Sequence, residues 1–185
     1  FAKGRQPEGI SALADAIKVF PNYFQALYRM GSELFFQKRF KDAIPFLFKA
    51  SDLNPKSATS FYYLGYSLHS LGKQYNKSAL LVLTEAATLA PSSFQVLFTL
   101  GKIEREEGKP ADAEKHLLQA KKATKTPVPS LHFELAQTFA DLKKYKDAAD
   151  ELETFIKVGK LKPEEETKIR TTIATLREKA KAQGT

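Results

Sequence analysis

Apolar and small residues recur along the chain every three or four positions, which is the spacing of one face of an α-helix. The alternation of apolar and polar residues that is typical of a β-strand does not occur. Glycines such as Gly72, Gly108 and Gly159 interrupt the helical pattern. The pattern therefore predicts a series of short helices without strands. Its first two segments carry the spacing at Leu27, Met30, Gly31 and Leu34, and at Ala43, Leu47 and Ala50.

Prolines divide these predicted helices into pairs of nearly constant length. Pro21, Pro55 and Pro91 each follow an apolar-periodic segment and are spaced 34 and 36 residues apart. Downstream of each, an apolar residue precedes a glycine, and a fourth unit has alanine there. A single helix pair cannot bury its apolar faces alone, so we expect two antiparallel helices in each unit and stacking between units. The apolar–small pairs are Met30-Gly31, Leu64-Gly65, Leu100-Gly101 and Leu135-Ala136.

This pattern resembles the tetratricopeptide repeat, and four units match it in register over residues 24–160. The departures are Glu104 at an apolar position, Phe155 at a small position, and two extra residues near Gln74 and Tyr75. The resemblance implies an all-α, right-handed α-solenoid of antiparallel helix pairs. Besides the residues named above, the matches include Phe61, Leu68, Ala79, Leu83, Ala86, Leu97, Ala113, Leu117, Ala120, His132, Phe139, Tyr145, Ala148 and Leu152.

The same resemblance predicts where each unit begins and ends. Full repeats are expected at residues 24–57, 58–93, 94–128 and 129–162. Residues 1–23 fit the end of a first helix and the second helix of a preceding repeat, so we expect the chain to be part of a larger repeat protein. Residues 163–185 are expected to form a capping helix and tail, because Pro163 and the acids after it favour a helix start. Pro45, inside a predicted helix, should remove one backbone hydrogen bond.

Composition excludes several classes of protein. The 185 residues contain no cysteine, which rules out disulfides, thiolate metal sites and a cysteine nucleophile. No apolar run approaches the roughly 20 residues of a membrane-spanning helix, and no signal peptide is visible. We therefore expect a soluble protein, of the cytoplasm or the periplasm, and the sequence does not decide between them.

Catalytic and cofactor chemistry finds no support in the sequence. His69, His116 and His132 fall on three different repeats, without the spacing of a metal site or a catalytic triad. His132 is expected in the core and His116 in solvent. Acidic pairs such as Glu106-Glu107 and Asp150-Glu151 are interpreted as solvated helix faces. We expect a protein that is not an enzyme and has no cofactor and no metal.

The resemblance implies instead that a partner segment lies in a concave groove lined by the first helix of each repeat. An aromatic residue occupies the fifth position of every repeat, and the alternative is that these rings only pack between helices. Amphipathic tyrosines favour a binding surface. The expected partner has apolar anchors and some acidic character. The predicted groove residues are Tyr28, Arg29, Ser32, Phe35, Tyr62, Tyr63, Tyr66, His69, Phe98, Lys102, Arg105 and Phe133.

Three other kinds of partner are alternatives to such a segment. The two-carboxylate clamp that the family uses for chaperone C-terminal tails needs lysine and asparagine where this chain has Tyr28 and Ser32, so such tails are disfavoured. The net charge of +8 would suit binding to nucleic acid. Basic and acidic side chains are interspersed along the chain, however, and the predicted groove is aromatic and irregular, so nucleic acid is also disfavoured. Self-association into a homo-oligomer remains a third possibility.

Overall fold

A computed structural model describes residues 6–183 of the chain. This part consists of ten α-helices and one 3-10 turn, and it contains no strand. The chain divides into two compact units, residues 1–91 and 92–185, and each is described by itself. The helices of the first unit are α1 (Gln6–Val19), α2 (Phe24–Phe36), α3 (Phe40–Leu53), α4 (Ala58–Ser70) and α5 (Asn76–Leu89). Those of the second are α6 (Phe94–Glu106), α7 (Pro110–Ala123), α8 (Pro129–Asp141), α9 (Tyr145–Val158) and α10 (Pro163–Gln183).

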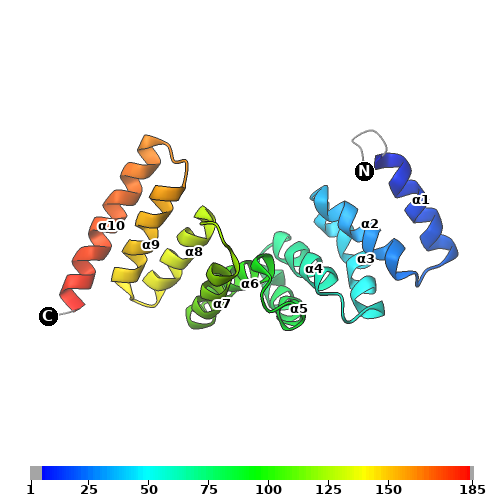
Figure 1. Cartoon of the computed structure of the whole chain (residues 1–185). Coiled ribbons are helices and arrows are strands. Elements are labelled where there is room, and N and C mark those ends of the chain that lie inside the picture. Colours follow the sequence, from blue (N-terminus) through cyan, green and yellow to red (C-terminus); the bar gives the residue numbers. More distant parts are fainter. Residues whose placement is uncertain (1–5, 184–185) are drawn as a thin grey trace. The chain divides into compact units, whose positions relative to one another are not determined.

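Consecutive helices of each unit pack side by side, as the ribbon shows (Figure 1). In the first unit, α2 pairs with α3 and α4 pairs with α5, while α3 packs on α4 and α1 packs on α2. The first helices α2 and α4 also contact each other directly. In the second unit, α6 pairs with α7, α8 pairs with α9, and α10 packs on α9. The all-α solenoid fold that the sequence predicts is confirmed.

Glycines at the eighth position of three repeats let each pair of helices approach closely. A Cβ atom added at Gly31 would lie 2.6 Å from Cγ of Leu47, and one at Gly101 would lie 2.7 Å from Cγ of Leu117. These distances are shorter than carbon atoms allow, so the leucine of the second helix occupies the space that a side chain would need. The small residues of the repeat are therefore required by helix packing.

The turns between paired helices use the left-handed backbone region. Lys38 and Lys143 adopt φ of 60° and 59°, and Gly108 adopts 73°. In the second repeat, Gly72 (φ 120°) instead leads into a 3-10 turn over Lys73–Tyr75. The two extra residues expected near Gln74 and Tyr75 are accommodated by this turn, which lets α5 begin at Asn76.

Each unit has its own apolar core. In the first, Met30, Leu34, Leu47 and Leu64 are buried, and residues of α1 pack against them. In the second, α10 contributes Ile173 and Leu176, which are 7% and 8% exposed.

Three further features concern the internal proline, the N-terminal residues and the possibility of a membrane-spanning helix. Pro45 lies inside α3 with its side chain exposed to solvent. The helix tail expected at residues 1–3 lies outside the described residues. Within the described part of the chain, no helix combines the length and the apolar character that crossing a membrane would require.

Candidate partner-binding surface

Rings from α2 and α4 form a continuous layer on the first unit. We call the set Tyr28, Phe35, Phe36, Tyr62, Tyr63 and Tyr66 the aromatic surface. Five of its six members were predicted from the repeat positions, and Phe36 was not. The repeat pattern contained a signal for Phe36, because it occupies the thirteenth position of its repeat, which the family also uses for partner contacts.

Phe35 lies at the centre of this layer. Its ring stacks on Tyr63 with centroids 4.4 Å apart and meets the edge of Tyr66 at 5.3 Å. Tyr63 in turn stacks on Tyr28 at 6.3 Å and meets Phe36 edge-on at 5.6 Å. Aromatic pairs at such distances contribute about 0.5–1.5 kcal/mol each beyond their buried area. Contacts between repeats therefore hold the rings of α2 and α4 in fixed positions.

The aromatic surface serves both packing and exposure. Phe35 and Tyr63 also pack against the core of the first unit. Phe36, by contrast, is 67% exposed although its ring touches Phe35 and Tyr63. The tyrosines of the set are half-buried. The alternative that the fifth-position rings only pack between helices is compatible with the half-buried Tyr28 and Tyr62, but it does not concern the exposed Phe36.

The hydroxyl of Tyr63 has a raised pKa. Burial raises the pKa of its hydroxyl above the usual 10.0, and the neighbouring hydroxyls of Tyr28 and Tyr62 raise it further. A hydrogen bond with Tyr28 acts in the same direction. The phenol therefore stays neutral, and can act as a hydrogen-bond donor, over the whole physiological range.

The polar groove residues predicted on the first unit differ in their availability. Arg29 is exposed, and no described carboxylate lies within ion-pair distance of it. The hydroxyl of Ser32 donates to the carbonyl of Arg29 at 3.0 Å. Nδ1 of His69 lies 2.8 Å from Oδ1 of Asn76 at the start of α5, so the helix pair itself holds this imidazole. Arg29 is thus the charge on this face that could meet a ligand.

The predicted groove residues of the second unit are engaged within it. Phe98 stacks on Phe94 one turn earlier in α6, at 5.6 Å. Phe133 packs on Phe155 of α9, at 5.2 Å. Phe155 replaces the small residue of the family pattern, and its ring contact with Phe133 explains the replacement. Lys102 is half-buried.

Arg105 is neutralised across repeats. Its guanidinium lies 3.0 Å from Oε2 of Glu134 and 3.9 Å from Oδ2 of Asp141, both on α8. The adjacent Glu104 instead forms a hydrogen bond with His116, whose Nδ1 lies 2.7 Å from Oε2 of the glutamate. The charge of Arg105 is therefore satisfied within the second unit, whereas Arg29 of the first unit has no ion-pair partner among the described residues.

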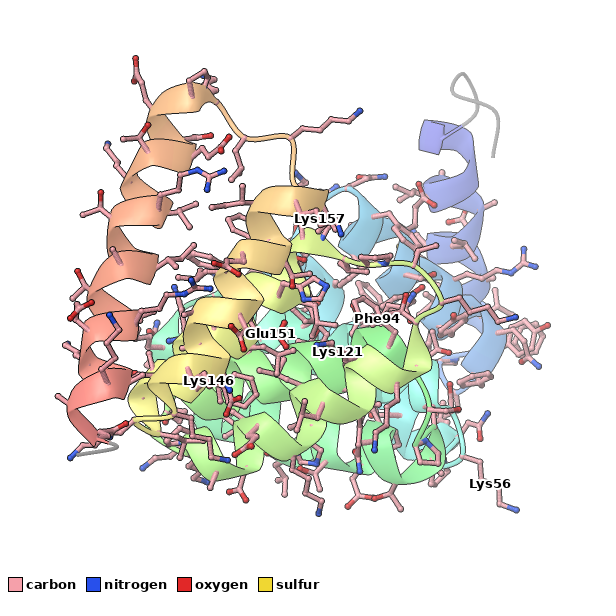
Figure 2. The ribbon with its side chains drawn as sticks, turned by 60° about the vertical axis from the view of Figure 1, so that its left-hand side comes forward. Lys56, Phe94, Lys121, Lys146, Glu151 and Lys157 are labelled. Carbon is pink, nitrogen blue, oxygen red and sulfur yellow. The ribbon has the colours of Figure 1, made fainter. Side chains whose placement is uncertain are left out.

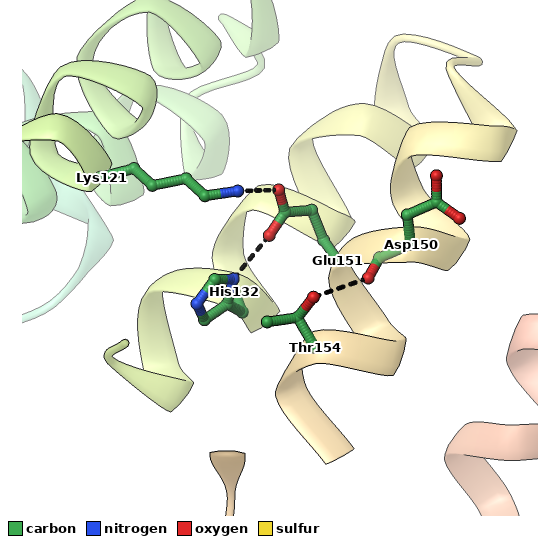
Figure 3. Close-up of polar contacts among 5 residues, drawn as sticks. All are labelled: Lys121, His132, Asp150, Glu151 and Thr154. Atoms are coloured by element: carbon green, nitrogen blue, oxygen red, sulfur yellow. Dashed lines mark hydrogen bonds and ion pairs between the residues drawn. The ribbon is translucent and has the colours of Figure 1, made fainter. Parts of the chain in front are cut away.

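Two expectations about solvated polar residues, those for His116 and Glu151, are wrong. His116 is held by Glu104 and is not free in solvent. Glu151 is 8% exposed, because one carboxylate oxygen lies 2.6 Å from Nδ1 of His132 and the other lies 2.6 Å from Nζ of Lys121 (Figure 3). The side chain of Lys121 on α7 consequently points toward Glu151 on α9 (Figure 2). Lys121 and Glu151 are 30 residues apart, so the spacing of residues within one repeat does not indicate that they are partners. The contact becomes apparent only when the repeats are stacked.

No group of three or more histidine, aspartate and glutamate side chains in the described chain has an arrangement that could hold a metal ion. The aromatic surface and Arg29 have no nucleophile–base pair among them. The chemistry that this arrangement can perform is non-covalent: stacking, hydrogen bonding through phenols, and attraction of one negative charge.

Comparison with solved structures supports the fold. A crystal structure of YrrB, described as a tetratricopeptide repeat protein with an unusual peptide-binding site, aligns with a TM-score of 0.75 at 19% identity, covering 84% of this chain and 78% of that one. MamA from Desulfovibrio magneticus RS-1 aligns with a TM-score of 0.74 at 21% identity, covering 84% and 86%. PilF from Pseudomonas aeruginosa gives 0.70 at 20% identity, covering 94% and 82%. A comparison with curated protein sequences found no match.

Family models place the repeats in the sequence itself. One model of the tetratricopeptide repeat matches residues 24–57 and a second matches residues 98–163. The two matches together cover just over half of the 185 residues. They fall on helix pairs of both units, and the structural neighbours share the same architecture. The chain belongs to the tetratricopeptide repeat family.

Proposed function

We propose that this chain is a non-enzymatic protein-interaction scaffold that holds a segment of a partner protein on the aromatic surface of its first unit. The proposal depends on one observation above all: Phe36 is 67% exposed although its ring adjoins a layer of rings that is otherwise half-buried. Tyrosine and phenylalanine contribute strongly to interfaces because they bury a large area at low conformational cost. The peptide-binding site named for YrrB shows that a related architecture serves such a role in that protein.

The second unit is a weaker candidate for the same role. Its ring residues at the fifth repeat position, Phe98 and Phe133, stack on Phe94 and Phe155 of the same unit. Arg105 has its charge satisfied by Glu134. A partner would have to break these contacts before it could use the residues. We therefore place the partner on the first unit.

Two phenylalanines of the first unit allow a matched test. Phe36 of α2 and Phe48 of α3 are exposed to the same degree, 67% and 65%, but only Phe36 belongs to the aromatic surface. Partner capture with the intact chain, followed by quantitative mass spectrometry, should lose its specific partners with Phe36→Ala and keep them with Phe48→Ala. A combined Tyr62→Ala and Tyr66→Ala variant should show the same loss, provided that its thermal unfolding confirms that it is folded.

Two outcomes of the capture experiment would exclude the aromatic surface as the binding site. If Phe36→Ala retains every captured partner, or if Phe48→Ala loses the same partners, then the binding site lies elsewhere on the chain.

A further inference from the structure

The aromatic surface also indicates which kind of segment it binds. Resting on the function proposed above, we infer that the partner segment is proline-rich, extended in a polyproline II conformation, and followed by an acidic residue. The inference depends on the combination of an exposed ring, a phenol and an arginine on adjoining helices, where the phenol hydroxyl and the guanidinium have no partner among the described residues. Each of these observations excludes a different alternative.

The first step concerns the backbone of the partner. The described residues of the first unit form helices and turns only, so they provide no strand edge to which a β-strand could be added. An amphipathic helix satisfies its own backbone and requires a groove for apolar anchors, without any need for hydroxyl donors. A polyproline II segment has no internal hydrogen bonds, so its carbonyl groups remain available to donors on the protein. Phenol groups between ring faces match this requirement.

Tyr66 supplies such a donor. Its backbone carbonyl accepts a hydrogen bond from Ser70 at 2.9 Å, but within the described chain no group accepts one from its hydroxyl. The ring itself is held in place by Phe35 at 5.3 Å and Phe40 at 5.8 Å. Because the ring is fixed, its hydroxyl can meet a carbonyl of the partner at little entropic cost.

The ring faces favour proline side chains. The exposed ring of Phe36 on α2 presents flat apolar area beside the half-buried tyrosines of α4. Proline rings pack on such faces, and the pre-formed polyproline II helix loses little conformational entropy on binding. Ring faces also attract cations, but the unpaired Arg29 and the net charge of +8 oppose a basic partner.

Arg29 sets the charge of the partner. Arg29, Ser32 and Phe36 follow one another at three- and four-residue spacing along α2, so they share one face of the helix. Ser32 is held by a hydrogen bond to the Arg29 carbonyl, and the guanidinium of Arg29 is exposed on this face, two turns before Phe36. A carboxylate near one end of the proline-rich segment would pair with it.

Three synthetic peptides test the inference on the full chain. The first has ten prolines followed by two glutamates, the second has ten prolines followed by two lysines, and the third is an alanine- and leucine-based helical peptide ending in two glutamates. Binding is followed by NMR of the tyrosine and phenylalanine rings during titration. We expect the first peptide to bind at least about tenfold more tightly than either of the others.

Variants locate the contacts. Tyr66→Phe keeps the ring and removes the donor, so it should weaken the first peptide by about 3- to 10-fold, in keeping with one hydrogen bond. Arg29→Ala should abolish the difference between the glutamate and lysine peptides. Phe48→Ala, which changes an equally exposed ring outside the aromatic surface, should leave all three affinities unchanged.

The outcomes separate this inference from the function on which it rests. If the helical peptide shifts the ring signals and binds as tightly as the proline peptide, the proline-rich assignment is overturned and the binding surface stands. Equal affinity for the glutamate and lysine peptides in the wild type overturns the acidic requirement. If none of the three peptides shifts the ring signals, the proline-rich assignment falls, and the Phe36→Ala capture experiment decides the proposed function independently.

Discussion

Oε2 of Glu151 lies 2.6 Å from Nδ1 of His132, and the two side chains are only 10% and 6% exposed. Glu151 belongs to α9, His132 belongs to α8, and Lys121 of α7 binds the other carboxylate oxygen at 2.6 Å. One carboxylate thereby links three consecutive helices, drawn from two repeats. The pairing meets the requirement that a buried charge have partners, and it ties repeat stacking to a specific polar contact.

Removal of this carboxylate should destabilise the second unit strongly. Glu151→Ala leaves the buried imidazole of His132 without its partner, and we expect the free energy of unfolding to fall by about 2–3 kcal/mol. Chemical denaturation followed by circular dichroism measures the change. Glu153→Ala is the control, because its ion pair with Arg177 is about half exposed and should contribute under about 1 kcal/mol. Equal effects of the two substitutions would contradict a structural role of the buried pair.

Alanine at Gly31 or Gly101 should separate the helices of a pair. The added Cβ would lie 2.6 Å or 2.7 Å from the leucine that faces it, so side chains and backbone must move. Overpacking of this kind costs about 1–3 kcal/mol, which thermal denaturation would detect. The fourth repeat already has Ala136 at this position, so Ala136→Gly tests the converse, and it should destabilise through lost packing and greater chain entropy. If Gly31→Ala leaves the stability unchanged, the close approach of α2 and α3 does not require glycine at this position.

Alkaline pH should destabilise the first unit through Tyr63. Its pKa is raised in the folded state, whereas in the unfolded chain it returns to about 10. The unfolded chain therefore binds fewer protons between these two values, and the free energy of unfolding falls as pH rises above about 10. Tyr63→Phe removes this contribution, so its stability should decline less steeply than that of the wild type when both are measured between pH 9 and 11. Parallel curves would refute the assignment.

Substitutions of Pro45 and Pro110 should have opposite effects on stability. Pro45 lies inside α3 and deprives the helix of one backbone hydrogen bond, whereas Pro110 is the first residue of α7, where no such bond is lost. Pro45→Ala should raise the free energy of unfolding by about 1–2 kcal/mol, after allowance for the greater freedom of the unfolded chain. Pro110→Ala should leave it unchanged or lower it. A loss of stability with Pro45→Ala would mean that the proline has a packing role on the surface of α3.

Helix positions were largely predictable because helical periodicity is a local property. The spacing of Leu27, Met30 and Leu34 places these residues on one face, and all three are buried in the structure. The extra residues near Gln74 could also be anticipated, since they shift the repeat by two positions. The 3-10 turn that absorbs them could not, because it depends on the backbone angles of Gly72.

Charge partners were predicted poorly for a physical reason. Arg105 pairs with Glu134, Lys121 with Glu151, and Lys144 with Glu114, at separations of 29 or 30 residues. A separation close to one repeat brings residues together only after neighbouring units have stacked. The burial of Glu151 follows from the same stacking, whereas Glu104 is held by His116 of its own helix pair.

The sequence by itself determined the helices, their pairing and the small residues that permit it, because these depend on periodicity and side-chain volume within one repeat. Only the tertiary structure decided which aromatic residues meet across α2 and α4, and which charges are neutralised before any partner arrives. Phe36 illustrates the difference. Its position in the repeat was visible from the sequence, but its exposure beside Phe35 and Tyr63 results from how two repeats pack.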